Sequence, residues 1–339
     1  MPRINPLMDP FITAATAKLA KFNTPQPKDP VARRLRQQEQ SRLSVAELGI
    51  PIVDVATEDH TVAVPGHPDA RLRVYWPTSE RADAGAGLPV FVYFFGGGWT
   101  IAGIDDIGWD ATERRRAAAA GAIIIAGEYS LAPENQFPTQ PDQCWAIFEW
   151  AVQHATELGG DPAKLAIGGA SSGGNLAAAV TLMNRERNNH PIRLQVLEAP
   201  SVDLTMKHAD TKGLKTGVPD AILRRLGGML IDQYLGKGNK AARKDPLASP
   251  LRAASHVGLP EALIMTAELD PLRGDGEAYY RALTKAGVPA TCIRYIGQTH
   301  TSGGLVGHVP AADHIDATVV GAIRALATAP VTYPVLADV

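Results

Sequence analysis

The sequence predicts an α/β fold, in which a mostly parallel sheet is covered by helices on both faces. From residue 90 onward, short apolar runs alternate with longer helix-prone segments, which is typical of parallel strands joined by crossover helices. The run at 88–95 is apolar throughout and indicates a strand buried on both faces. With 339 residues, 45% of them hydrophobic, the chain can form one large domain with a substantial core.

The elements are expected in a regular order. Two helix-prone segments, 10–21 and 31–48, precede the first strand, which starts near Val55. Residues 61–77 are expected to form an antiparallel hairpin, because Pro65–Asp69 is typical of a turn. The remaining strands are expected at 90–95, 122–128, 165–168, 193–197, 263–267 and 291–295, and the helices at 107–120, 142–158, 176–187, 275–286 and 314–325.

A serine flanked by glycines lies where a strand meets a helix. The segment Gly169-Ala170-Ser171-Ser172-Gly173 follows the short apolar strand 164–168 and precedes the alanine-rich helix 175–183. On such a tight turn the central residue is strained, and close packing leaves no room for Cβ atoms two positions to either side. The hydroxyl of Ser171 is then exposed above the sheet. The pattern alone is weak in a glycine-rich chain, but its position between a strand and a helix indicates a nucleophile.

Three consecutive glycines, Gly96 to Gly98, follow a buried strand. Glycines at this place let the backbone approach another group closely with its N–H groups unpaired. A phosphate-binding loop would carry Lys followed by Ser or Thr after the glycines, whereas this chain has Trp99-Thr100-Ile101. We therefore expect an oxyanion-binding loop, whose donors are the backbone N–H groups of Gly97, Gly98 and Ser172.

Two further residues complete a candidate catalytic triad. Asp270 ends the apolar strand 262–270, at the edge where open α/β sheets place functional residues, although a lone Asp before Pro is more often a turn former or helix N-cap. His300 lies in a short loop after a strand, and His308 is the alternative farther along. The chain order Ser171, Asp270, His300 is the order of α/β-hydrolases and favours His300.

Four segments match motifs of one known family in the right order. Phe95–Trp99 matches H-G-G-G-W, Glu128–Glu134 matches D-Y-R-L-A-P-E, Gly169–Asn175 matches G-D-S-A-G-G-N, and Asp270–Arg273 matches the start of D-P-L-R-D. Through them, residues from about 60 to 325 resemble the bacterial hormone-sensitive-lipase-like esterases, within the α/β-hydrolases. The resemblance implies the α/β-hydrolase fold, carboxylesterase activity, a helical cap and a site without a cofactor.

Three positions depart from the family pattern, and each loses a charged or ionisable side chain. Phe95 replaces a histidine, Ser130 an arginine and Ala170 an acidic residue. Losing one member of a buried polar set would leave its partners unsatisfied, at a cost of about 1–3 kcal/mol each. We therefore expect that the three were replaced together and that apolar packing of Phe95 stands in for the lost polar contacts.

A long segment interrupts the alternation of strands and helices. Residues 201–252 lie between two strands and contain the stretch 221–234, whose apolar residues recur at helical spacing. We expect this segment to form an apolar cap over Ser171 together with the N-terminal helices, a peripheral helix at the sheet edge being the alternative. The expected pocket residues are Trp99, Met206, Leu214 and Leu230. The expected division is 1–55 for N-terminal cap helices, 56–200 and 253–339 for the catalytic core, and 201–252 for the cap insertion.

The predicted activity is that of a serine carboxylesterase acting on short- to medium-chain acyl esters. In this mechanism Ser171 attacks the ester carbonyl, His300 transfers the proton and Asp270 orients His300. An amidase, a carbamate hydrolase or a lactone hydrolase with the same triad is the alternative. A third possibility is a non-catalytic small-molecule receptor on the same fold. A receptor would be expected to lack the base or the nucleophile, so the complete triad argues against it.

Charge and composition exclude several other classes. The formal net charge of -2 argues against a nucleic-acid surface or a polybasic membrane anchor, and we expect the run Arg114–Arg116 on a solvated helix face. No stretch reaches the ~18–20 apolar residues of a membrane span, and the N-terminus lacks the apolar run of a signal peptide. Cys144 and Cys292 are expected as buried free thiols, which fits a cytoplasmic location.

The expected partner is a small-molecule ester substrate, with no nucleic acid and no stable membrane anchor. We expect no cofactor and no metal, because no cluster of His, Cys, Asp or Glu has ligand spacing. A homodimer is left open, since the strand 291–295 would be available for pairing if it lies at a sheet edge.

Overall fold

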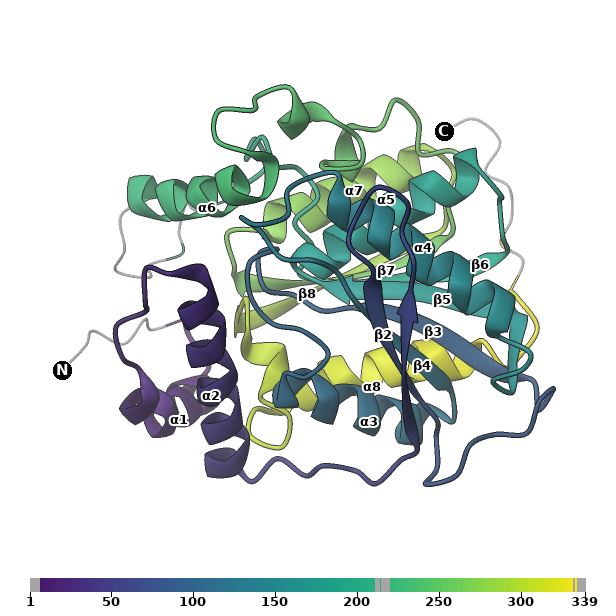
Figure 1. The fold of residues 1–339 in the computed structure, drawn as a ribbon. Coiled ribbons are helices and arrows are strands. Elements are labelled where there is room, and N and C mark those ends of the chain that lie inside the picture. The colour runs from purple at the N-terminus through teal and green to yellow at the C-terminus, as the bar shows by residue number, and fades with distance from the viewer. Residues whose placement is uncertain (1–6, 211–213, 215–219, 332, 334–339) are drawn as a thin grey trace.

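The described residues, 7–210, 214, 220–331 and 333 of the computed structural model, contain a single eight-stranded sheet (Figure 1). Across the sheet the strands are β1 (Thr57–Val62), β2 (Ala70–Tyr75), β4 (Ile123–Glu128), β3 (Leu88–Phe94), β5 (Gly160–Ala170), β6 (Ile192–Glu198), β7 (Glu261–Leu269) and β8 (Ala290–Thr299). β2 pairs antiparallel with β1 and β4, and the other pairs are parallel. The predicted parallel sheet with an antiparallel start is confirmed, and β8 forms an edge.

Helices cover both faces of this sheet (Figure 1). One face carries α4 (Thr139–His154), α5 (Ser172–Glu186) and α7 (Arg273–Lys285), and the other carries α3 (Ile107–Ala120) and α8 (Pro310–Ala325). Because successive strand residues point to opposite faces, one strand serves both cores. In β3, Val92 and Phe94 join the first core, whereas Phe91 and Tyr93 join the second. The β3 side chains that face either core must be apolar, which explains the unbroken apolar run at 88–95 in the sequence.

The N-terminal helices and α6 lie on the same side of the molecule (Figure 1). These are α1 (Pro10–Leu19), α2 (Pro30–Leu48) and α6 (Asp220–Leu235). The side chains of Asp9 and Asp29 accept hydrogen bonds from backbone N–H groups in the first turns of α1 and α2. Single 3₁₀ turns are η1 (Ala20–Phe22), η2 (Ala242–Lys244), η3 (Pro250–Arg252) and η4 (Ser302–Gly304). The predicted helices are therefore present, and α6 begins and ends within one residue of its predicted bounds.

The prediction that Arg114–Arg116 lie on a solvated face is wrong. Consecutive helix residues point in directions about 100° apart, so α3 turns Arg116 inward, where it is 3% exposed. Its two terminal nitrogens donate to the carboxylate of Glu198 at 2.9 and 2.8 Å, and its Nε donates to Asp316 at 3.0 Å. Arg115 also pairs with Asp316, at 2.8 Å. The basic run thus belongs to a buried cluster of ion pairs between α3, β6 and α8.

The two cysteines match the prediction only in part. Cys144 and Cys292 are free thiols, but only Cys144 is buried, since Cys292 is partly exposed.

Within the described part of the chain, no helix combines the length and apolar character that crossing a bilayer requires.

Candidate active site

Ser171 lies at the turn between β5 and α5. Its φ of 53° and ψ of -114° are outside the regions that non-glycine residues normally occupy, at a cost of about 1–3 kcal/mol. The adjacent glycines make the turn sterically feasible. A Cβ on Gly173 would collide with the carbonyl oxygens of Phe94 and Phe95, and a Cβ on Gly169 would collide with the backbone of Gly173. Close packing of β3, β5 and the start of α5 therefore requires the glycines that the sequence places there.

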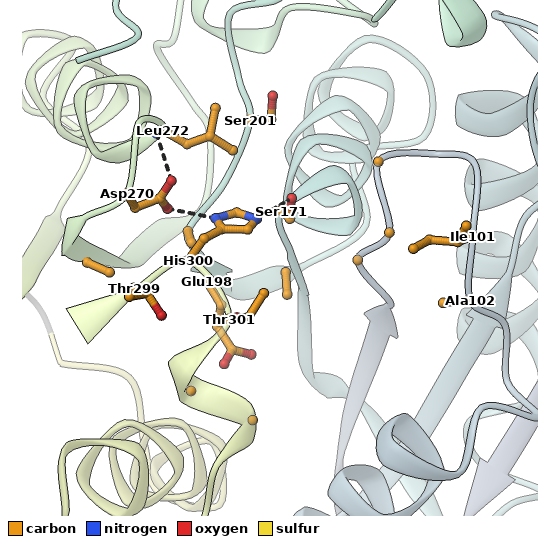
Figure 2. Close-up of a pocket in the computed structure, with 18 of the residues that line it drawn as sticks. Ile101, Ala102, Ser171, Glu198, Ser201, Asp270, Leu272, Thr299, His300 and Thr301 are labelled. Atoms are coloured by element: carbon orange, nitrogen blue, oxygen red, sulfur yellow. Dashed lines mark hydrogen bonds and ion pairs between the residues drawn. The ribbon is translucent and has the colours of Figure 1, made fainter. Parts of the chain in front are cut away.

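Side chains that follow three different strands form one hydrogen-bonded chain (Figure 2). Nδ1 of His300, after β8, lies 2.7 Å from Oδ2 of Asp270, after β7. Nε2 of the same ring lies 3.0 Å from Oγ of Ser171, after β5. The other oxygen of the fully buried Asp270 accepts the N–H of Leu272 at 2.8 Å. All three predicted side chains therefore meet at the carboxyl edge of the sheet.

His308, the alternative to His300, lies outside this hydrogen-bonded chain. Its Nε2 is 2.6 Å from the backbone carbonyl of Leu48 at the end of α2. The contact joins the segment before α8 to the N-terminal helices and leaves no role for His308 beside Ser171.

Opposing effects act on the imidazole of His300. Burial lowers the pKa of His300, whereas the negative charge of Asp270 and the hydrogen bond to it raise that pKa, and the net pKa lies above the ordinary histidine value. The carboxylate therefore stabilises the protonated ring. This arrangement suits a base that must take a proton from Ser171 and hold it briefly.

The loop after β3 has an unusual backbone conformation. Its φ angles are 147° at Gly97, 58° at Gly98, 59° at Trp99 and 73° at Ala102. Trp99 and Ala102 are non-glycine residues in a conformation that must be imposed by surrounding contacts. Among the residues that the structure describes, none accepts a hydrogen bond from the N–H of Gly97, Gly98 or Ser172. These predicted donors are therefore available to an anion.

A cavity of about 1250 Å³ joins the triad to the N-terminal helices and α6. Ser171, Asp270 and His300 line it, together with residues of α2 and α6. Of the predicted pocket residues, Trp99, Met206 and Leu230 line the cavity, whereas Leu214 is buried and is not part of its wall. Leu230 lies close to the loop, because a Cβ placed on Gly98 would be 3.3 Å from its Cδ1.

Two residues beside the nucleophile had no predicted role. The hydroxyl of Tyr129 donates to the carbonyl of Phe95 at 2.9 Å and lies 3.2 Å from Oγ of Ser172. The carbonyl of Glu198 accepts the N–H of Ser171 at 2.8 Å. Tyr129 belongs to the segment that matches D-Y-R-L-A-P-E, which could have indicated it. Glu198 contacts Ser171 through its backbone carbonyl, which every residue type has, so the sequence could not have predicted this contact.

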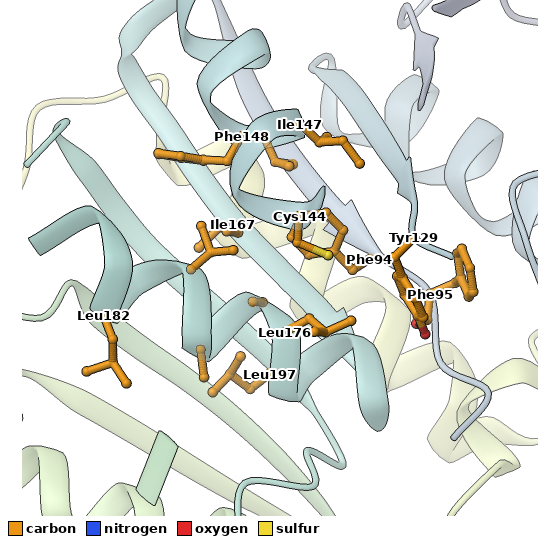
Figure 3. Packing of buried hydrophobic residues seen from close by; sticks show 14 of the residues in the cluster. Phe94, Phe95, Tyr129, Cys144, Ile147, Phe148, Ile167, Leu176, Leu182 and Leu197 are labelled. Atoms are coloured by element: carbon orange, nitrogen blue, oxygen red, sulfur yellow. The ribbon is translucent and has the colours of Figure 1, made fainter. Parts of the chain in front are cut away.

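The three departures from the family pattern have distinct surroundings. Phe95 is 3% exposed and its ring stacks on Tyr129, with centroids 4.5 Å apart (Figure 3). The hydroxyl of Ser130 accepts a hydrogen bond from Gln143 at 2.8 Å. Ala170 packs against the second core and lines the cavity. Apolar packing of Phe95 is therefore present, while joint replacement of the three positions stays a prediction.

Comparison with known proteins agrees with this architecture. A family model described as the alpha/beta hydrolase fold matches residues 91–302. The chain is 36% identical over 266 residues to the carboxylesterase NlhH of Mycobacterium tuberculosis, covering 74% of this chain and 77% of NlhH. It is 32% identical over 301 residues to the esterase LipI of the same organism, covering 84% of this chain and 90% of LipI.

A solved structure extends the likeness to three dimensions. The thermostable carboxylesterase EstE1, cloned from a metagenomic library, matches with a TM-score of 0.76 and 32% identity, over 89% of this chain and 98% of EstE1. The chain therefore belongs to the α/β-hydrolase fold family, among its hormone-sensitive-lipase-like carboxylic ester hydrolases.

Proposed function

We propose that this protein is a serine carboxylesterase that hydrolyses short- to medium-chain acyl esters through an acyl-enzyme. The observation that carries the proposal is the continuous chain from Asp270 through His300 to Ser171, with separations of 2.7 and 3.0 Å. Beside it lie the unpaired backbone N–H groups of Gly97, Gly98 and Ser172. A nucleophile, an oriented base and anion donors are the parts that acyl transfer needs.

Acylation begins when Oγ of Ser171 attacks the ester carbonyl carbon. Nε2 of His300 takes the hydroxyl proton, and Asp270 stabilises the resulting imidazolium. The carbonyl oxygen becomes an oxyanion, which accepts hydrogen bonds from the loop donors. His300 then gives the proton to the departing alkoxide, so that the alcohol leaves and the acyl group stays on Ser171.

Deacylation repeats the same steps with water in place of the serine. His300 removes a proton from the water as it attacks the acyl carbonyl, and then returns that proton to Oγ of Ser171. The carboxylic acid leaves and the enzyme is restored.

The cavity supports the proposed chain lengths. Leu230 lies close to Gly98 and narrows the space beside the loop. The volume of about 1250 Å³ nevertheless exceeds what an acetyl ester fills, and Met206 and Ile231 add apolar wall. Because Leu230 lies beside the donor loop and the cavity has an apolar wall, we propose short to medium acyl chains as the substrates. In this proposal residues 1–55 and 201–252 act as the cap.

The test is hydrolysis of p-nitrophenyl esters from acetate to palmitate by the wild type and by Ser171→Ala. We expect turnover that peaks at short or medium chains and is lost in the variant, which removes only one oxygen. A serine-reactive phosphonate should add once, at Ser171. The matched control is Ser255→Ala, at an exposed serine whose Oγ accepts a local backbone hydrogen bond.

Two outcomes would count against the proposal. Retention of a tenth of the activity in Ser171→Ala would show that another residue is the nucleophile. A folded wild type that is labelled at Ser171 by the phosphonate but hydrolyses none of the esters would favour an amide, carbamate or lactone substrate.

A further inference from the structure

The loop that carries the proposed oxyanion donors is contacted from outside the sheet by a side chain of α2. Nε of Arg34 donates to the backbone carbonyl of Thr100 at 2.9 Å, and its NH2 group donates to the carbonyl of Ala132 at 2.8 Å. The same guanidinium pairs with the carboxylate of Glu134, at 3.1 and 2.5 Å. One planar group therefore joins α2 to two loops, one after β3 and one after β4.

These two loops are also bonded to each other. The N–H of Ala132 donates to the carbonyl of Trp99 at 2.8 Å, one residue before the carbonyl that Arg34 holds. Arg34 thus closes a short ladder of hydrogen bonds, and both carbonyl groups that it contacts belong to turns. The guanidinium fork can span the two carbonyls and the carboxylate at once, which an ammonium group cannot do.

A defined path leads from Thr100 to the proposed donors. The N–H groups of Thr100 and Ile101 donate to the carbonyl of Gly97, at 3.1 and 3.2 Å. That carbonyl and the N–H of Gly98 belong to the same planar peptide unit and point in opposite directions. The direction of the Gly97 carbonyl therefore sets the direction of the Gly98 N–H. Thr100 holds that carbonyl through its own N–H, so the position of Thr100 affects the orientation of the Gly98 donor.

We propose that Arg34 is a positioning residue, which holds the loop of Gly97 and Gly98 in the conformation that binds the oxyanion. The inference rests on the proposed esterase function. It assigns to α2 a part in the chemical step, in addition to its place in the cavity wall.

Arg34 acts through the loop and not through the substrate. It is absent from the residues that line the cavity, whereas its neighbour Arg33 is among them. Its side chain is only 20% exposed and its donors face carbonyl and carboxylate oxygens. Substitution of Arg34 should therefore change transition-state stabilisation more than substrate binding.

The test uses Arg34→Lys, which keeps the charge, and Arg34→Met, which keeps most of the stem. We expect kcat on p-nitrophenyl butyrate to fall by about 10- to 100-fold in both, with KM within about twofold, because a displaced donor costs less than the 10²–10³ of a deleted one. The affinity for an alkylboronic acid, whose tetrahedral serine adduct mimics the oxyanion, should fall by a similar factor. Guanidinium ion should restore part of kcat in Arg34→Ala.

The matched control is Arg42→Ala, on the same helix. The guanidinium of Arg42 donates to Glu39 of α2 at 2.8 and 2.7 Å and is largely exposed, so kcat should stay at the wild-type value. A purely structural role for Arg34 would lower the unfolding midpoint without changing kcat at a temperature well below it. If Arg34→Met is too unstable for kinetics, Arg34→Lys carries the test.

Two results would overturn the inference. One is a kcat within twofold of the wild type in Arg34→Lys. The other is a raised KM at constant kcat, which would make Arg34 a residue for cap docking or substrate binding. Failure of the proposed function looks different, since it would appear as an inactive wild type or an active Ser171→Ala.

Discussion

The two sides of Ser171 are held in place in different ways. On the acid–base side, His300 and Asp270 are joined by side-chain hydrogen bonds and follow the ends of β8 and β7. On the proposed oxyanion side, the candidate donors are the backbone N–H groups of Gly97 and Gly98, in a loop with several positive φ angles, and of Ser172 at the start of α5. The first side depends on which side chains are present. The second depends on a conformation that contacts from other elements must impose.

This difference determines how each side responds to substitution. Removing a side chain from the acid–base side deletes a chemical group and leaves the backbone as it was. A substitution on the oxyanion side acts through geometry, so its effect is graded and extends to residues that touch only the loop. The predictions below separate the two kinds of response.

The largest effect is expected for Asp270→Asn. The amide would hold the imidazole in the wrong tautomer, so kcat/KM should fall by about 10⁴-fold while the fold is retained. The measurement is p-nitrophenyl butyrate hydrolysis together with thermal unfolding. A loss of less than tenfold would show that Asp270 does not orient His300. Asp69→Asn, at an exposed residue of the hairpin turn, is the control.

On the other side, Gly97→Ala should lower kcat by about 10²–10³-fold, comparable to the loss of one oxyanion donor. Gly97 has a φ of 147°, and a Cβ there would collide with the carbonyl oxygen of Ile101. The control is Gly321→Ala in α8, where a Cβ would meet no atom within 4 Å and kcat should be unchanged. Equal kcat in the two variants would mean that the loop conformation is not needed for turnover.

A smaller effect is expected for Phe95→His. The imidazole would replace a buried ring that stacks on Tyr129 and would introduce polar nitrogens into that packing. The free energy of unfolding, measured by urea denaturation, should fall by about 1–3 kcal/mol, and kcat should not rise. A large gain in activity from this single change would contradict joint replacement of Phe95, Ser130 and Ala170.

The smallest effect is a shift in the pH profile. His300 must be neutral to accept the proton, and its pKa is raised above the ordinary histidine value. Activity should therefore be lost as pH falls through that raised pKa, so that the acid limb of kcat/KM has its midpoint above about 6.5. The rate of phosphonate labelling at Ser171 should follow the same limb. Activity that stays flat well below the histidine range would exclude His300 as the base.

Most of the sheet and the acid–base side could be predicted from the sequence. The strand runs are apolar on both faces, and Ser171, Asp270 and His300 stand directly after strands in a recognisable order. The predictions for Leu214 and Arg116 are wrong for a different reason. Whether a residue faces a cavity, the core or solvent depends on which elements pack against it, and periodicity does not specify those partners.

Arg34 illustrates the same limit on the oxyanion side. It lies in a helix rich in charged residues, where nothing local distinguishes it from Arg33 or Arg36. Its partners Thr100 and Ala132 are 66 and 98 residues away and offer only backbone carbonyls, whose presence is independent of residue type. A contact of this kind becomes visible only when the chain is folded.

The buried cluster of Arg116, Glu198 and Asp316 constrains how this sequence can change. Removing one member of such a cluster leaves an uncompensated charge and costs about 3–5 kcal/mol, whereas replacing all members with apolar residues of similar volume is often neutral. A stepwise route to an apolar version therefore passes through destabilised intermediates. Glu198 also accepts the N–H of Ser171 through its backbone carbonyl, so the cluster includes a residue that contacts the candidate nucleophile. Substitutions at these three positions are therefore expected to be tolerated only in combination, at a place in the fold close to Ser171.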